Sequence, residues 1–366
     1  MRSALIWLHK YTGLILGLIL SITGVSGSLV VFDRELDEWL TPETVNFEPG
    51  QPPAPFNVAV ESAKQALDTE SEPTRLMTGR HSGAPHIIRF PTPEGAPGPV
   101  EVSINPATGD ALAVRNWGEY PVTWFYRLHL SFLGGERGEI LVGVMGFCML
   151  FFCFSGLVIW WPRLGRNGNR DWWRAFTVNR HAGIFRLNFD LHKTVGIYFL
   201  PVFIMLAVTG IEIVWHGPFR DALAYVLPVQ EEPSPVSTPD GGTSISMDEA
   251  AASARTVYPA SKITRLYVPA NDIAPWRVTF IHPDDWWSEY SGTMVYLDQY
   301  SGEVLDVWDS RQVPLGNKVL EWFFPLHNGD ALSLIGRIVV FIAGLLPSLL
   351  FGTGVYMWWK KRRRKP

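Results

Sequence analysis

Four apolar stretches that contain no charged side chain constrain this chain more than any other feature. They occupy residues 11–32, 140–162, 194–211 and 338–359. A helix that crosses the hydrocarbon core of a bilayer needs about 20 apolar residues. Each stretch therefore predicts a membrane-spanning helix, and the expected fold class is an α-helical membrane protein with a four-helix transmembrane bundle.

The first stretch resembles a cleavable secretory signal in one respect, because Arg2 precedes it and small residues end it. However, it is too long for a signal peptide and it lacks an A-x-A cleavage pattern. Its motif LHK also recurs at the third stretch. We therefore expect the first stretch to remain in the protein as a spanning helix.

The charges between the stretches predict the orientation in the membrane. Residues 163–193 carry seven basic and two acidic side chains, and the tail after Trp359 carries six basic and no acidic ones. In contrast, residues 33–137 carry eight basic and fifteen acidic side chains, and residues 212–337 carry eight and seventeen. Because Lys and Arg gather in short cytoplasmic loops, both chain termini are expected in the cytoplasm. The net charge of −4 is small because the acidic segments 33–137 and 212–337 offset the basic loop and tail.

The apolar stretches and the charges together divide the chain into spans, external domains and cytoplasmic segments. Two α+β domains of about 100 residues, a normal domain size, are expected outside the membrane. The expected spans are residues 1–32, 138–162, 192–216 and 335–359, the external domains are 33–137 and 217–334, and the basic cytoplasmic segments are the loop 163–191 and the tail 360–366.

The chain is internally duplicated, as two ungapped offsets show. An offset of 183 residues aligns the LHK motif at His9 with the LHK motif at His192. An offset of 198 residues aligns the aromatic segment that ends in His129 with the one that ends in His327, and it also superposes the tryptophan pairs of the second and fourth stretches. Such self-similarity indicates a repeat architecture. Each half therefore reads as helix, external domain, helix.

The external domains repeat a short pattern of their own. In each, a helical segment, residues 58–67 or 247–257, precedes a TRL motif and alternating strand-like runs. A hairpin follows, with a turn at Gly109 in the first domain and at Gly302 in the second. Proline-rich segments, EPGQPPAP and VQEEPSPVSTPDGG, precede the two domains and are typical of linkers.

The four repeated histidines suit haem ligation. His9 and His192 begin the two stretches that start on the cytoplasmic side, whereas His129 and His327 precede the two that start on the external side. Low-spin haem iron takes two axial imidazoles, and helical bundles supply them from facing helices. The register favours one haem near each surface, with His9 paired to His192 and His129 paired to His327.

Any haem here is expected to be non-covalent haem b. The only two cysteines, Cys148 and Cys153, lie inside the second stretch, and no C-x-x-C-H attachment motif occurs. Four of the arginines and two lysines near the histidines are candidate partners for haem propionates, although positive charge near the membrane also serves orientation. These residues are Arg127, Arg137 and Arg337 on the external side and Arg186, Lys10 and Lys193 on the cytoplasmic side.

Each histidine taken alone is also typical of an interfacial or core side chain, and only the paired register favours ligation. Two histidines without repeat partners are weaker ligand candidates: His216 in place of an outer ligand and His181 in place of His9. Glu212 is expected at a solvated helix end. Surface roles are expected for the three histidines of the external domains, His81, His86 and His282.

At this point the chain resembles the PepSY-associated transmembrane family, bacterial inner-membrane proteins with two external PepSY domains. The resemblance covers nearly the whole chain and rests on the segments WLHKYTGLILGLILSITGVSGSLVVF and DLHKTVGIYFLPVFIMLAVTG, and on the SG and TG turns of the external modules. Within the family the chain is most similar to the members that reduce ferric siderophores such as ferrioxamine. The resemblance implies two b haems, external PepSY-like domains, a ferric siderophore as substrate and the inner membrane as the location.

The expected function is electron transfer from a cytoplasmic donor to a ferric siderophore outside. No G-x-G-x-x-G fingerprint opens a βαβ unit and no P-loop occurs, so the donor is expected to bind transiently, as a reduced flavin, a quinol or a separate reductase. Membrane lipid surrounds the spans, and no nucleic-acid partner is expected. Two other readings remain open: a haem-free regulatory or assembly protein, and a component of a siderophore permease.

Overall fold

A computed structural model describes residues 2–45, 52–162, 172–285, 287 and 292–363. Parts of three expected segments lie outside the described residues: the first proline-rich linker, the basic loop at 163–191 and the end of the basic tail. The chain divides into two compact units. We call them the helical unit, Met1–Asp33, Phe125–Ala222 and Trp322–Pro366, and the sheet unit, Arg34–Trp124 and Leu223–Glu321.

Among the described residues of the helical unit, three helices are long and apolar enough to cross a membrane. They are α1 (Arg2–Val30), α5 (Gly135–Trp160) and α12 (Ser333–Arg362), the last preceded by the short helix η2 (Asp330–Leu332). A fourth span is formed if the bent pair α7 (Ile184–Tyr198) and α8 (Leu200–Val214) counts as one. The chain is therefore a multi-pass helical membrane protein. The shorter helices around these spans are α4 (Pro121–Ser131), α6 (Trp172–Phe176), α9 (His216–Ala224) and α11 (Leu315–Asn328).

The third apolar stretch differs from the single helix expected over residues 192–216. Its two helices meet at Phe199 with a bend of 58°. Pro201 lies in the first turn of α8. A proline has no N–H to donate and its ring crowds the carbonyl four residues earlier, here that of Ile197. Pro201 thus removes one backbone hydrogen bond at the position where the helix breaks.

The helix of the third stretch also begins earlier than expected, at Ile184 rather than at residue 192. The extension includes Asp190, whose side chain is only 1 % exposed. Two cations neutralise this carboxylate: Arg186 at 3.0 Å and Lys193 at 3.1 Å, one turn away on either side. A buried carboxylate is tolerated when it is paired in this way, so the helix continues through a charged segment that hydropathy alone would place outside the span.

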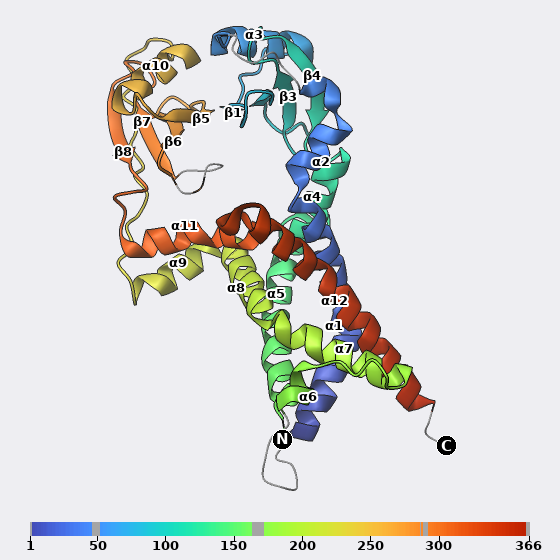
Figure 1. Ribbon diagram of the computed structural model, residues 1–366. Coiled ribbons are helices and arrows are strands. Elements are labelled where there is room, and N and C mark those ends of the chain that lie inside the picture. The colour runs from blue at the N-terminus through green and yellow to red at the C-terminus, as the bar shows by residue number, and fades with distance from the viewer. Residues whose placement is uncertain (1, 46–51, 163–171, 286, 288–291, 364–366) are drawn as a thin grey trace. The chain divides into compact units, whose positions relative to one another are not determined.

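Helices α1 and α12 run side by side and pack closely (Figure 1). The contact is closest at Gly24, where an added Cβ would lie 2.2 Å from the carbonyl oxygen of Gly344. The hydroxyl of Ser28 donates a hydrogen bond of 2.8 Å to the carbonyl of Phe341 across the same contact. Small residues let helix backbones approach in a membrane, and these positions cannot hold a larger side chain without separating the helices.

The sheet unit contains one eight-stranded antiparallel sheet in the order β4-β3-β2-β1-β5-β6-β7-β8. The two external domains expected as separate modules are thus continuous through their sheets. The strands of the first half are β1 (Arg75–Met77), β2 (His86–Arg89), β3 (Val100–Ile104) and β4 (Ala111–Asn116), and those of the second half are β5 (Lys262–Tyr267), β6 (Trp276–Ile281), β7 (Thr293–Leu297) and β8 (Val304–Trp308).

The two half-sheets join where the repeated TRL motifs meet. In the β1–β5 ladder, Leu76 pairs with Leu266, which is the equivalent leucine of the other motif. Both leucines are fully buried. An unpaired edge strand exposes a row of backbone donors and acceptors, and this pairing removes one such edge from each half. The local symmetry axis of the duplication therefore passes between these two residues.

The helices and turns expected for each external domain are confirmed. Helix α3 (Phe56–Leu67) and helix α10 (Met247–Val257) pack on the sheet and contribute to one shared core. The hairpin turns contain Gly109 at φ +80° and Gly302 at φ +73°, a conformation that favours glycine. The carboxylate of Asp248 accepts hydrogen bonds of 2.8 and 3.0 Å from the first two amides of α3 and so links the two halves. The remaining elements of this unit are α2 (Asp33–Leu40) and η1 (Pro42–Thr44).

We expect the stability of the sheet unit to fall in acid because of His86. The surface role expected for His86 is wrong, because its side chain is buried. Its Nδ1 accepts a hydrogen bond of 2.9 Å from the amide of Gly79, and burial, reinforced by the charge of Lys262, lowers the pKa of His86 to about 4. The unfolded chain binds the proton more readily. The neutral His86 side chain therefore makes its full contribution to the free energy of unfolding above the ordinary pKa of 6.5, and this contribution is lost as the pH falls toward 4. The free energy of unfolding should fall by about 2 kcal/mol between pH 7 and pH 5.

Hydrogen exchange of the β2 amides in the full detergent-solubilised chain, compared at pH 7 and pH 5 after correction for intrinsic rates, measures this effect. The matched control is His86→Asn, whose amide oxygen can accept the Gly79 bond and does not titrate. An equal loss of protection in acid in both proteins would contradict the assignment to His86.

Candidate functional site

The structure brings the four repeated histidines together as two pairs. The rings of His9 on α1 and His192 on α7 have their centroids 6.5 Å apart and their planes at 79°. The rings of His129 on α4 and His327 on α11 have their centroids 6.1 Å apart and their planes at 44°. Each pair takes one histidine from each half of the duplicated sequence. We call them the His9–His192 pair and the His129–His327 pair.

The two pairs lie toward opposite ends of the spanning helices. Helix α1 contacts both of them: it carries His9 in its third turn, and the carbonyl of Thr23 near its other end lies 2.9 Å from Nδ1 of His129. At the α-helical rise per residue, these two positions are about 20 Å apart along the axis. One pair is therefore near each end of the apolar region.

In the His9–His192 pair, each imidazole contacts a buried hydroxyl through Nδ1. Nδ1 of His9 lies 2.7 Å from Oγ of Ser155 on α5, and Nδ1 of His192 lies 2.8 Å from Oγ1 of Thr353 on α12. Ser155 and Thr353 are 198 residues apart and are equivalent in the duplication. The edge of the Phe152 ring packs on the His9 ring, with centroids 5.4 Å apart. The helix that carries each histidine thus depends on a neighbouring helix to orient the ring.

In the His129–His327 pair, one imidazole also contacts a buried hydroxyl through Nδ1, whereas the other contacts a backbone carbonyl. Nδ1 of His327 lies 2.8 Å from Oγ1 of Thr209 on α8. Nδ1 of His129 instead meets the carbonyl of Thr23, although Ser26 is the residue equivalent to Thr209. In the described part of the chain, the hydrogen bonds to these four rings reach Nδ1, and the carbonyls of Leu350 and Leu206 also lie beside the His192 and His327 rings. In each ring Nε2 is therefore the nitrogen that remains for another group.

The spacing within each pair fits a metal ion held between two imidazoles. Metal–imidazole bonds are about 2 Å long, so two rings that share one ion through Nε2 have their centroids about 6 Å apart. Both observed separations, 6.5 and 6.1 Å, have this size. The spacing therefore suits one ion, or one prosthetic group that carries an ion, between the two rings of each pair.

A glycine lies beside each imidazole, opposite its Cε1 atom. A Cβ added to Gly27 would lie 2.6 Å from Cε1 of His129, and one added to Gly210 would lie 3.2 Å from Cε1 of His327. Beside the other pair, a Cβ added to Gly156 would lie 3.7 Å from Cε1 of His9, and one added to Gly354 would lie 3.9 Å from Cε1 of His192. The rings of the His129–His327 pair are therefore held more tightly against their neighbouring helices than those of the His9–His192 pair.

The hydroxyl partners were missed in the sequence interpretation, but a signal for them exists. The two offsets of the duplication align one Ser-Gly or Thr-Gly dipeptide of each apolar stretch with one of its partner stretch, and in the structure these four hydroxyl residues are at most 6 % exposed. The four dipeptides are Ser26-Gly27, Ser155-Gly156, Thr209-Gly210 and Thr353-Gly354. Buried hydroxyls at equivalent positions in all four spans indicate a common role, and the structure places each dipeptide beside one of the four histidines.

The two weaker histidine candidates do not join either pair. His181 is exposed in the segment before α7, where its amide donates to the side chain of Asn179. His216 contacts the carboxylate of Glu212 through Nδ1 at 2.5 Å. The expectation that Glu212 is solvated is wrong, because its side chain is only 4 % exposed. The carboxylate faces inward at the end of α8, where His216 satisfies it.

Several of the candidate propionate partners already have protein partners. Among the candidates expected on the external side, Arg337 donates hydrogen bonds of 3.1 and 2.7 Å to the carbonyl of Val31 and lies over the Phe32 ring, so it caps the end of α1. Arg137 is exposed in the first turn of α5, and Arg127 is half-buried on α4. A propionate role for these last two residues stays a prediction.

The cytoplasmic candidates are similarly engaged. Arg186 and Lys193 both pair with Asp190, and the ammonium of Lys193 also donates to the carbonyl of Arg174 at 2.6 Å. The ammonium of Lys10 lies 4.1 Å from the centroid of the Tyr11 ring, a cation–π contact. These contacts hold the cations near the His9–His192 pair without using the imidazoles.

The donor set suits a prosthetic group better than a bare ion. Among the described residues, no cluster of three or more His, Cys, Asp or Glu side chains can hold a metal ion. Protein sites for bare transition metals take three or four side-chain ligands. An iron atom in a porphyrin already has four nitrogen ligands and needs only two axial imidazoles. Each histidine pair provides that number, with flanking glycines that leave room.

Comparison with known proteins places the chain in a family. The family model described as the PepSY-associated TM region matches residues 6–361. No curated protein matches the chain. The family match extends over both halves of the duplication and includes all four paired histidines. The chain therefore belongs to the PepSY-associated TM region family.

Proposed function

We propose that this protein is a di-haem electron-transfer protein that reduces ferric siderophores on the external side of the bacterial inner membrane. The observation that carries the proposal is the presence of two histidine pairs with ring centroids 6.5 and 6.1 Å apart, in which Nδ1 of every ring has a hydrogen-bond partner among the described residues. The family membership supports a membrane role for the chain, and the pairs support the cofactor.

Each part of the site would contribute in a defined way. When bound, haem b would supply a reversible one-electron couple. Nε2 of His9 and His192 would ligate one iron, and Nε2 of His129 and His327 would ligate the other. Gly156 and the three equivalent glycines leave the Cε1 side of each ring free of a side chain. Because the two pairs are about 20 Å apart along α1, electrons could enter near one membrane surface and leave near the other.

The substrate class follows from the chemistry of iron release. Hydroxamate-type siderophores bind Fe(III) through hard oxygen donors, a preference that is much weaker for Fe(II). One electron from the protein converts the bound Fe(III) to Fe(II), and the siderophore then dissociates with its own bonds unchanged. The electron comes from a donor that is oxidised on the cytoplasmic side, a reduced flavin, a quinol or a reductase. The acidic sheet unit would face the side where the ferric complex arrives.

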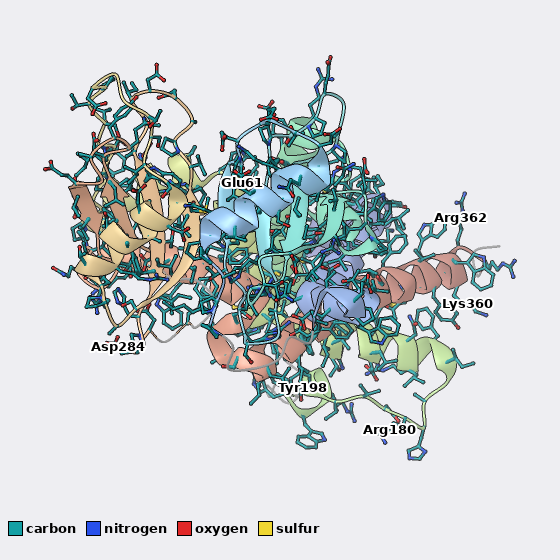
Figure 2. The ribbon with its side chains drawn as sticks, turned by 90° about the horizontal axis from the view of Figure 1, so that it is seen from above. Glu61, Arg180, Tyr198, Asp284, Lys360 and Arg362 are labelled. Atoms are coloured by element: carbon teal, nitrogen blue, oxygen red, sulfur yellow. The ribbon has the colours of Figure 1, made fainter. Side chains whose placement is uncertain are left out.

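The orientation rests on the basic end of α12. Lys360 and Arg362 extend from the last turn of this helix (Figure 2). The aromatic rings of Trp358 and Trp359 lie beneath the guanidinium groups of Arg362 and Arg363 at 5.4 and 4.1 Å. Basic side chains above an aromatic belt are typical of the cytoplasmic interface. This end of α12, and with it the His9–His192 pair, would therefore lie on the cytoplasmic side.

A haem count and a visible spectrum of the detergent-purified protein test the proposal. We expect about two non-covalent haems per chain and sharp low-spin α bands on reduction, because each pair supplies two axial imidazoles. Reoxidation of the reduced protein by ferric ferrioxamine, with the iron-free siderophore as the matched control, then tests the substrate class. A colourless protein from cells supplied with ample haem would overturn the cofactor and favour a haem-free regulatory role.

A further inference from the structure

We infer that the buried Ser-Gly and Thr-Gly dipeptides tune the two sites, because three of their hydroxyls fix the tautomer of the facing histidine and strengthen it as a ligand. Ser155, Thr353 and Thr209 are thus positioning residues. The inference rests on the proposed function, since it concerns how the same histidines hold haem iron.

The direction of each hydroxyl–imidazole bond follows from where the hydroxyl proton goes. A serine or threonine in a helix can donate its proton to the carbonyl four residues earlier. Oγ of Ser155 lies 2.7 Å from the carbonyl of Phe151, and Oγ1 of Thr353 lies 2.8 Å from that of Leu349. Oγ1 of Thr209 has the same contact at 2.8 Å within α8. In this arrangement each hydroxyl proton is committed to its own helix, and the oxygen is left to accept.

A hydroxyl that only accepts determines the tautomer of the imidazole. A neutral imidazole carries one proton, and the nitrogen without it bears the lone pair. Nδ1 of His9, His192 and His327 must therefore donate to Ser155, Thr353 and Thr209, which leaves the lone pair on Nε2. This is the form that binds a metal. Two such rings in one pair cannot hydrogen-bond to each other through Nε2, because neither nitrogen has a proton there.

The fourth histidine reaches the same tautomer by another route. The hydroxyl of Ser26 donates to the carbonyls of Ile22 and Thr23 at 2.8 and 3.0 Å, and Nδ1 of His129 meets the carbonyl of Thr23 directly at 2.9 Å. A carbonyl oxygen can only accept. His129 therefore also donates from Nδ1. The geometry fixes one tautomer at all four positions although the acceptor differs at one of them.

The electronic effect of these bonds is the measurable part of the inference. When Nδ1–H donates to an acceptor, the imidazole becomes a more basic ligand, and removal of such a partner typically costs 10–100-fold in metal affinity. A more basic axial ligand favours Fe(III) over Fe(II). Loss of the acceptor at one ring should therefore weaken the preference for Fe(III) about tenfold, which for a one-electron couple corresponds to a rise in potential of about 59 mV.

Redox titration and electron paramagnetic resonance of the haem-loaded Thr353→Val variant test the inference. Valine keeps the shape of threonine and removes the acceptor, so we expect one of the two midpoint potentials to rise and one set of low-spin g values to change. Thr353→Ser keeps a hydroxyl and should restore both signals. Ser21→Ala is the matched control, because the Ser21 hydroxyl is buried and donates to the carbonyl of Gly17 but has no histidine partner.

The outcomes separate this inference from the proposed function. If the wild-type protein binds no haem, the proposed function fails and this inference fails with it. If the wild-type protein binds haem but both potentials and both sets of g values are unchanged in Thr353→Val and in Ser155→Ala, the inference alone is overturned. If Thr353→Val or Ser155→Ala loses haem, Thr353→Ser and Ser155→Thr decide the question, because both keep a hydroxyl. The inference expects these two variants to retain both haems with wild-type potentials, and loss of haem in them as well would contradict it.

Discussion

A His192→Ala variant is expected to lose one of two haems while it keeps the other. The rings of His192 and His9 are the only members of their pair, and Thr353 orients the His192 ring through Nδ1. With haem bound as proposed, removal of one imidazole would leave the iron of that site with a single axial ligand and would open the space that the ring filled. The haem content should fall from about two to about one per chain, and the remaining signal should stay low-spin.

The controls for this prediction come from the same helices. His9→Ala should give the same loss, and the double variant should lose no more, because the two histidines act at one site. His181→Ala should retain both haems, since this side chain is exposed and joins neither pair. Quantitative haem extraction and electron paramagnetic resonance measure the result. Retention of both haems in His9→Ala and in His192→Ala would exclude their pairing as ligands.

Gly27→Ala is expected to disrupt the site of the His129–His327 pair selectively, whereas Gly354→Ala should be tolerated. A methyl group on Gly27 would lie 2.6 Å from Cε1 of His129, closer than real Cβ contacts, while one on Gly354 would lie 3.9 Å from Cε1 of His192. Overpacking of this kind costs about 1–3 kcal/mol. If the strain falls on the ring, the affinity of that site for haem should fall roughly tenfold to a hundredfold.

Haem titration of the two glycine variants tests this difference in one assay. In both variants the methyl group is added at the glycine of a Ser-Gly or Thr-Gly dipeptide beside one of the four histidines, so the cost of replacing a helical glycine is similar. Selective loss of the site that contains His129 in Gly27→Ala, with wild-type content in Gly354→Ala, is the expected result. Equal behaviour of the two variants would show that the closeness of Gly27 to His129 has no part in ligand placement.

Much of this architecture is visible in the sequence because it depends on local patterns. The charge-free stretches predicted the long helices, and the positive φ of Gly109 and Gly302 agrees with the hairpin turns that their neighbours indicate. The duplication was also informative about the candidate site. It matched His9 with His192 and His129 with His327, and these are the rings that lie together in the structure.

The features that escaped prediction depend on contacts between distant segments. Two prolines lie inside apolar stretches, yet Pro201 separates α7 from α8 whereas α12 continues through Pro347. Residue type alone does not distinguish the two cases. Similarly, β1 is only three residues long, and nothing in its own sequence specifies that it pairs with β5. The hydroxyl partners belong to the same class: Thr353 and His192 are 161 positions apart.

The origin of each histidine pair has a consequence for the ancestry of the fold. Every pair joins one residue from each half, and the β1–β5 ladder likewise joins Leu76 of one half to Leu266 of the other. Each half orients its own imidazoles, as Ser155 does for His9, but a single half completes no pair. An ancestor of half this length would have needed a symmetric homodimer, with the same surface used by both copies. Fusion of two such copies would make that association permanent and would allow the two halves of the chain to diverge in sequence.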